Sequence, residues 1–77
     1  MIEYDDNNRI TYEEETDSLY IWKAPPQGRL GAVMLYCDKE NQAMVSLDTD
    51  EVGTIVGIEI NNLHKICKDF KLKKNRN

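Results

Sequence analysis

The sequence predicts a single small α+β domain: an antiparallel β-meander of five to six short strands with one C-terminal helix packed on one sheet face. Three observations favour this class. Short runs rich in β-branched and aromatic residues alternate with turn-forming residues as far as residue 60. Helical spacing of apolar residues begins only after that point, and 77 residues allow one modest core. We expect one domain over residues 1–71 and a basic tail over residues 72–77.

The first half of the chain contains a predicted hairpin and a predicted central strand. Residues 2–4 and 9–13 form the expected hairpin. Residues 18–23, with the sequence SLYIWK, give the strongest strand prediction because they are rich in β-formers. This strand has apolar residues on both faces, Leu19 and Ile21 on one and Tyr20 and Trp22 on the other. We therefore expect it to be central and covered on both sides, at least in part.

The loop at residues 24–28 separates this strand from the later ones, because Pro25 and Pro26 donate no ladder hydrogen bonds. Strands are expected at residues 32–37, 43–47 and 54–60, with a turn at residues 48–53. In the last strand, Val56, Ile58 and Ile60 share one face, and Ile55, Gly57 and Glu59 share the other. Gly57 indicates a bulge or the close approach of another backbone or of a bulky ring such as that of Tyr20 or Trp22. An equally weighted alternative is that the strand simply tolerates glycine here.

The C-terminal segment has the spacing of an amphipathic helix. Leu63, Ile66, Cys67 and Phe70 stand at positions i, i+3, i+4 and i+7. The expected helix is about ten residues long, begins at an Asn61 or Asn62 cap, and packs on the face of Val56, Ile58 and Ile60 because it is too short to stand alone. Cys67 is then buried, and we expect both cysteines to be reduced, buried side chains of a cytoplasmic protein.

The net charge of −4 is unevenly distributed. Residues 1–60 carry thirteen acids and four bases, whereas residues 61–77 carry six bases and one acid. An acidic body thus precedes a basic end. No run approaches the roughly 18 apolar residues of a membrane span, and the first residues do not have the pattern of a secretory signal.

Two stretches resemble family 2283 of domains of unknown function. The first is Tyr12–Ile21, with the sequence YEEETDSLYI, and the second is Asp48–Ile60, with the sequence DTDEVGTIVGIEI. The resemblance covers roughly residues 10–68 and implies a small prokaryotic or phage protein without an established activity. It also implies, from gene pairing in some members, a neutralising partner of a small ribonuclease-like toxin.

Side chains that are able to carry chemistry do not form a recognisable catalytic set. In a calcium loop beginning at Asp48, Val52 would occupy a ligand position, and a strand rather than a helix follows. A pair of Cys67 and His64 would need a reactive thiol, but Cys67 lies in the apolar stripe. We expect no catalytic residue, no metal and no cofactor, although a small enzyme that uses Asp17, Asp48 and Glu59 is a competing hypothesis.

These observations favour a non-enzymatic module that binds and inhibits a partner protein, either as an antitoxin-like protein or as a phage anti-defence inhibitor. The acidic body suits a basic, nucleic-acid-handling partner. The candidate contact residues are Tyr20, Trp22, Glu59, Asp17 and Asp48. We also expect a homodimer with Trp22 or Tyr20 near the contact.

The alternative is a nucleic-acid-binding regulator that acts through its basic end. Its candidate residues are Lys68, Lys71, Lys73, Lys74 and Arg76.

Overall fold

The computed structural model describes residues 2–4, 7 and 9–72, and within these residues the chain forms one six-stranded antiparallel sheet and one short helix. The elements are β1 (Ile2–Tyr4), β2 (Ile10–Glu13), β3 (Ser18–Trp22), β4 (Gly31–Asp38), β5 (Ala43–Thr49), β6 (Ile55–Asn61) and α1 (Leu63–Ile66). The predicted α+β class is confirmed. The expected basic tail falls largely on residues 73–77, which lie outside the described residues.

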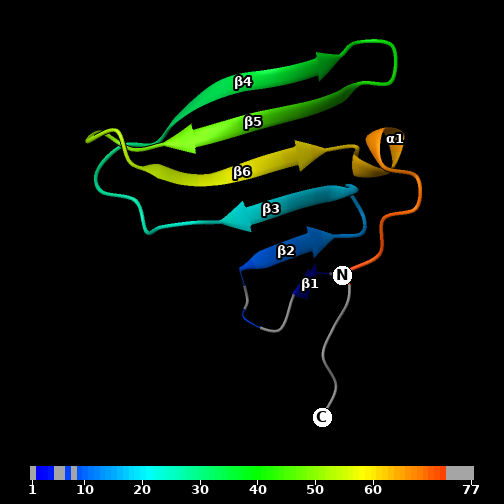
Figure 1. The fold of residues 1–77 in the computed structure, drawn as a ribbon, viewed down its shortest axis with the longest axis horizontal. Coiled ribbons are helices and arrows are strands. Elements are labelled where there is room, and N and C mark those ends of the chain that lie inside the picture. Colours follow the sequence, from blue (N-terminus) through cyan, green and yellow to red (C-terminus); the bar gives the residue numbers. More distant parts are fainter. Residues whose placement is uncertain (1, 5–6, 8, 73–77) are drawn as a thin grey trace.

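The sheet consists of two three-stranded meanders placed side by side, in the order β1-β2-β3-β6-β5-β4 (Figure 1). The proline-containing loop after β3 carries the chain from the middle of the sheet to its far edge, where β4 begins. The next two strands then return towards the centre, so that β6 pairs with β3. The Cα atoms span 39 × 35 × 16 Å. The shortest dimension, 16 Å, is that of a single sheet layer with little above or below it.

Cross-strand pairing assigns the side chains to two faces, because residues directly opposite one another point the same way. Leu19 lies opposite Tyr12 and Ile60 on the first face, which we call the apolar face. Tyr20 lies opposite Glu59 on the second, which we call the aromatic face. The other members of the apolar face are Ile10, Ile21, Val45, Leu47 and Ile58, and those of the aromatic face are Thr11, Trp22, Ser46, Asp48 and Gly57.

The core covers one end of the apolar face. Its buried side chains are Tyr12, Leu19 and Leu63, the last contributed by α1. Partly buried side chains packed against them are Ile10, Ile21, Ile60, Phe70 and Leu72. The chain after β6 therefore closes the core with three side chains, and Leu72, where the predicted tail begins, is one of them.

The predicted ten-residue helix is wrong in length, because α1 ends after four residues. Cys67 has extended backbone angles, φ −127° and ψ 90°, and its N–H closes the last turn by donating to the Leu63 carbonyl at 2.8 Å. Leaving the helix here lets Phe70 reach Tyr12, with ring centroids 5.5 Å apart. In the described part of the chain, no helix is long and apolar enough to cross a membrane.

Burial is lower than the sequence suggests. β3 is central and covered in part on both sides, since Leu19 is buried on one face and Tyr20 is half-buried on the other, while Trp22 remains 46% exposed. Both cysteines are free and exposed rather than buried: Cys37 lies on the edge strand β4, and Cys67 follows the end of α1. The single layer explains the exposure of Trp22 and of both cysteines, because it provides no second layer of side chains to cover these positions.

The β5–β6 connection is organised by Asp50 rather than by the whole acidic segment. Asp48 was expected in this turn but belongs to β5. Asp50 is 7% exposed, and its Oδ1 accepts hydrogen bonds from the backbone N–H groups of Val52 at 3.1 Å and Thr54 at 2.9 Å. Its Oδ2 accepts from the N–H of Gln27 at 2.8 Å, which ties the proline loop to the turn. Burial opposes ionisation, but these donors outweigh it and lower the pKa of the Asp50 carboxyl.

We predict that Asp50→Ala lowers the melting temperature by several degrees, because three backbone N–H groups lose their acceptor. Asp38→Ala is the matched control, since the Asp38 carboxylate accepts hydrogen bonds only from Asn41 and the Glu40 backbone, within its own exposed turn, among the described contacts. Thermal unfolding followed by circular dichroism measures both variants. Equal melting temperatures for the two variants would show that Asp50 does not hold the turn.

Candidate functional site

The aromatic face carries a stacked pair of rings that three strands hold in place. The Tyr20 and Trp22 rings lie with centroids 4.4 Å apart and an interplanar angle of 32°. The Tyr20 hydroxyl donates to Asp48 Oδ2 at 2.7 Å. Tyr20 belongs to β3 and Asp48 to β5, so the phenol crosses the intervening strand β6 to reach its acceptor.

Gly57 makes this crossing possible. A Cβ atom at Gly57 would collide with the Tyr20 ring, and it would lie 2.6 Å from the Ile21 carbonyl oxygen. Of the alternatives that the sequence left open for this glycine, the structure shows the close approach of a ring, that of Tyr20. A glycine inside a strand is costly for the backbone, and here it provides the space that the phenol occupies.

The Tyr20 hydroxyl remains a donor over the whole physiological pH range. Partial burial, the hydrogen bond to Asp48 and the negative charges of Asp48 and Glu59 raise the pKa of Tyr20 to about 12. The phenol therefore stays neutral and its bond to Asp48 stays formed. This bond keeps the Tyr20 ring, and the Trp22 ring stacked on it, in one position.

Acidic side chains border this aromatic pair. A shallow hollow beside the rings is lined by Thr11, Glu13, Ser18, Leu19, Tyr20, Trp22 and Glu59. Glu59 lies directly opposite Tyr20 in the β3–β6 pairing, on the aromatic face where the sequence placed it. An indole face next to carboxylates is suited to a Lys or Arg side chain, which combines cation–π contact with ion pairing. We call Tyr20, Trp22, Glu13 and Glu59 the aromatic surface.

A second cluster joins the β2–β3 turn to α1. Asp17 Oδ1 accepts from the Tyr12 hydroxyl at 2.6 Å and lies 2.6 Å from His64 Nδ1. Asp17 Oδ2 accepts from the backbone N–H of His64 at 2.8 Å, and the Asp17 carbonyl accepts from that of Leu63 at 2.9 Å. Asp17 thus caps the N-terminus of α1, although it is distant from the helix in the sequence. Asn62 occupies the N-cap position but makes no side-chain cap bond.

The protonation states of this cluster follow from its hydrogen-bond acceptors. His64 Nδ1 faces the Asp17 carboxylate, and Nε2 lies 3.2 Å from the Phe70 carbonyl oxygen. Two acceptors favour the imidazolium, so the hydrogen bonds to Asp17 and then to Phe70 raise the pKa of His64. Burial opposes ionisation of Asp17, but its bonds from Tyr12 and His64 outweigh this and lower its pKa.

The structure separates the carboxylates that the sequence grouped together. Asp48 and Glu59 lie on the aromatic face, whereas Asp17 joins Tyr12, a residue of the apolar face. Among the described residues, no group of three His, Cys, Asp or Glu side chains is placed to hold a metal ion. Of the basic residues, Lys68 and Lys71 are exposed. Lys73, Lys74 and Arg76 lie outside the described residues.

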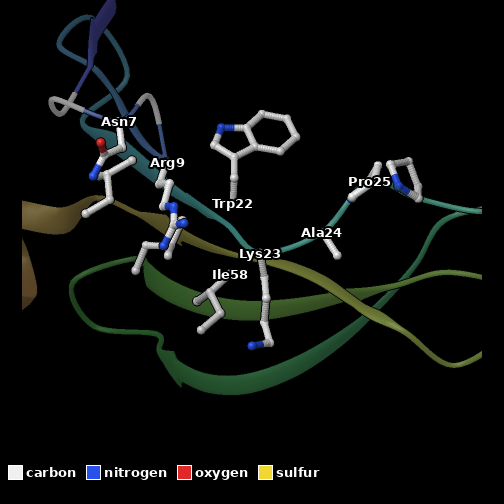
Figure 2. A pocket seen from close by; sticks show the side chains of 10 residues that line it. Asn7, Arg9, Trp22, Lys23, Ala24, Pro25 and Ile58 are labelled. Atoms are coloured by element: carbon white, nitrogen blue, oxygen red, sulfur yellow. The ribbon is translucent and has the colours of Figure 1, made fainter.

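The apolar face is left partly open at the end away from α1. A wide hollow there is lined by Ile10, Ile21, Ile58, Pro25 and Pro26, and Pro25 lies at its side away from Asn7 and Arg9 (Figure 2). The Lys23 and Trp22 side chains extend from neighbouring positions of the chain in opposite directions, so Trp22 points away from Lys23 and towards the aromatic face (Figure 2). The two faces of the sheet thus differ in chemistry as well as in coverage.

The sequence analysis missed the cap formed by Asp17 and the exposure of β4. The cap joins residues 47 positions apart, and no local pattern signals such a pairing. The exposure of β4 has a sequence signal, because residues 30–37 are apolar or small without alternation. An uncharged run of this kind predicts either a buried central strand or an edge that needs a partner.

Comparison with known proteins identifies one family. The family described as "Protein of unknown function (DUF2283)" matches residues 9–63, which run from just before β2 to the start of α1. The matched region includes Tyr20, Gly57 and Asp48. Neither the curated proteins nor the solved structures contain a significant match to the chain.

We predict that Gly57→Ala destabilises the fold by about 1–3 kcal/mol, because the added methyl group overpacks the place where the Tyr20 ring crosses β6. The Tyr20 ring and the Ile21 carbonyl must both move to admit it. Gly31→Ala is the matched control, since its nearest neighbour would be Thr49 Oγ1 at an ordinary 3.8 Å. Urea unfolding measures the free energy of unfolding of both variants. If Gly57→Ala is as stable as Gly31→Ala, the Tyr20 ring does not pass close to Gly57.

We predict that the stability gained from the His64 side chain is greatest between pH 3.8 and 6.5, the ordinary pKa values of Asp17 and His64. The raised pKa of His64 makes its contribution disappear as the pH rises above 6.5 through the folded value. The lowered pKa of Asp17 makes its contribution disappear as the pH falls below 3.8.

The measurement compares melting temperatures of the native protein and His64→Ala across this range. Lys65→Ala, on the same helix, serves as the control and should show a difference that does not follow this profile. A His64→Ala difference that grows above pH 6.5 would contradict the proposed pairing.

Proposed function

The chain belongs to the DUF2283 family, and from its exposed surfaces we propose that it is a small non-enzymatic module that binds a basic partner protein and inhibits it. The proposed biological settings are neutralisation of a toxin and inhibition of a host defence protein by a phage, in the cytoplasm. The family description itself assigns no activity, so the proposal rests on surface chemistry.

The observation that carries the proposal is that the Trp22 ring is exposed and yet kept in one position by its neighbours. Trp22 is 46% exposed, yet it stacks on a Tyr20 ring that Asp48 and Gly57 hold in place. A large ring that is already ordered loses little conformational freedom on binding. Trp and Tyr are also the residues most enriched among binding hot spots.

The charge around the rings supports a basic partner. Glu59 and Glu13 border Trp22, and Glu14 and Glu15 are exposed in the adjacent β2–β3 turn. The body of the chain carries thirteen acids against four bases. Such a surface attracts cationic proteins and speeds their association, with an effect that salt weakens.

The module would inhibit its partner if it covers the surface with which that partner binds nucleic acid. Proteins that handle nucleic acids expose Lys and Arg side chains to phosphate groups. An acidic module that engages those side chains would compete directly with nucleic acid. The competing hypothesis is that the chain itself binds nucleic acid through its basic end, which includes the exposed Lys68 and Lys71.

We predict that Trp22→Ala weakens binding of the partner by about 2 kcal/mol, roughly 30-fold in Kd, as expected for a hot-spot residue. Partners are captured from source lysate with the native protein, then purified and titrated by calorimetry against the native protein and the variant. Val52→Ala, which truncates an exposed apolar side chain in the β5–β6 turn, should bind as the native protein does.

Glu59→Lys should also weaken binding of the same partner, with a larger loss of affinity at low salt than at high salt. A partner that binds Trp22→Ala and Glu59→Lys unchanged would refute the aromatic surface. A gel shift with RNA or DNA that Lys68→Ala plus Lys71→Ala abolishes, in the absence of any protein partner, would favour the competing hypothesis.

A further inference from the structure

The strand β4 is an edge of the sheet with one neighbour, β5, in the described structure. Its large apolar side chains, together with the residue that precedes it, are between 50% and 60% exposed. They are Leu30, Val33, Met34, Leu35 and Tyr36. Their exposure extends over both faces of the sheet, since Val33 lies opposite Leu47 on the apolar face and Met34 lies opposite Ser46 on the aromatic face.

This edge lacks most of the usual protections against strand pairing. Natural edge strands carry Lys, Pro, inward-pointing charges or β-bulges, or are very short. β4 has eight residues, and between Leu30 and Cys37 the chain contains no charged residue and no proline. It has one irregularity, a bulge between Met34 and Tyr36.

We propose that β4 pairs with β4 of a second copy of this chain, antiparallel and across a two-fold axis perpendicular to the sheet. The result is a continuous twelve-stranded sheet, from two copies of the six strands described. A two-fold contact uses the same patch on both copies, so the patch must be complementary to itself. Face matching, strand length and charge each test this requirement.

The bulge makes the two faces match. A two-fold axis perpendicular to the sheet keeps each face on its own side, so paired residues must belong to the same face. Because of the bulge, Val33 and Tyr36 both lie on the apolar face, opposite Leu47 and Val45. Ala32 and Cys37 both lie on the aromatic face, opposite Asp48 and Met44.

One register satisfies these matches on both sides of the bulge and places the bulged residue Leu35 against Met34 at the two-fold axis. When paired residue numbers add to 69, all eight residues of Gly31–Asp38 find partners within the strand: 31 with 38, 32 with 37, 33 with 36 and 34 with 35. Sums of 68 or 70 place residues of opposite faces against each other, as in 32 with 36 or 33 with 37. Sums of 67 or 71 leave two residues of each strand outside the pairing.

Charge agrees with this register. Beyond the ends of β4, the same sum brings the segment of Arg29, whose Nε lies 3.9 Å from Glu51 Oε1, towards the turn that contains Glu40 of the other copy, twice in the dimer. The acidic residues Glu13, Glu14, Glu15 and Asp17 lie at β2 and the β2–β3 turn, on the other half of the sheet (Figure 1). Pairing at β4 therefore keeps the two acidic regions apart.

The exposed area is sufficient for a specific contact. Five large side chains that are about half exposed offer on the order of 100 Å² each, roughly 500 Å² per copy. Backbone groups and the small residues of β4 add to this, and a standard interface buries about 800 Å² per partner. The contact goes beyond the proposed function, because it leaves the aromatic surface on β3 and β6 open to another protein.

The first experiment measures mass by sedimentation equilibrium at high micromolar concentration. The native protein should approach 18.0 kDa, twice the 9.0 kDa of one chain. Val33→Lys plus Leu35→Lys should give a 9.0 kDa monomer. Val52→Lys, at an apolar residue with 64% exposure away from β4, should remain a dimer.

The second experiment tests the register by oxidation of single-cysteine additions in a Cys67→Ser background. Opposed residues of an antiparallel pair lie about 4.5–5.5 Å apart at Cα, within disulfide range. Ala32→Cys should form a covalent dimer with Cys37 of the second copy, seen on a non-reducing gel. Gly31→Cys and Val33→Cys, which report sums of 68 and 70, should crosslink at least 10-fold more slowly.

A native protein that sediments at 9.0 kDa overturns the dimer. The β4 edge would then be open to pairing with a strand of another protein. A dimer that survives Val33→Lys plus Leu35→Lys overturns β4 as its contact. Faster crosslinking of Gly31→Cys or Val33→Cys overturns the register. Because the aromatic surface is untouched by these variants, a partner bound through Trp22 should still bind them, and failure of one proposal is distinguishable from failure of the other.

Discussion

A six-stranded sheet in a single layer needs more cover than the ten residues from 63 to 72 provide, and the other features of the molecule follow from this shortage. Those residues reach one end of one face, where Leu63, Phe70 and Leu72 complete the core. The remainder of the sheet keeps apolar side chains in contact with water, which is unfavourable unless another molecule covers them. The proposed partner and the proposed second copy would each cover part of this exposed surface.

Three aspartates act as acceptors that hold distant parts of the chain together. Asp17 caps α1, Asp48 fixes the Tyr20 phenol, and Asp50 ties the proline loop to the β5–β6 turn. Each accepts donors from a segment distant in the sequence, so each closes a long loop. A small core contributes little stability, and these bonds supplement it by joining segments that the core does not reach. General acid–base chemistry would require the same oxygen atoms to be available to a substrate.

The sequence predicted what depends on local pattern. Alternation and turn residues placed the strands, and Gly57 signalled the ring that crosses it. The helix was overestimated because the spacing of Leu63, Ile66, Cys67 and Phe70 fits a regular helix, whereas the contact of Phe70 with Tyr12 requires the chain to leave it. The link between Asp17 and His64 depends on strand order, which brings distant residues together without a local signal. Exposure at Cys37 was missed for the same reason, since a strand's place at the edge is a property of topology.

The two proposed surfaces are geometrically related through the sheet. β5 carries Asp48, the acceptor that holds Tyr20, and it lies between the β4 edge and β6. Pairing with a second copy would place β4 inside a longer sheet and so restrain its neighbour β5, the strand that supports the aromatic surface. Because the two-fold axis is perpendicular to the sheet, both aromatic surfaces would face the same side. A partner with two basic sites on one surface would then engage both copies at once, and the second contact would form at high effective concentration. In this arrangement the edge contact strengthens binding at Trp22 without touching the partner.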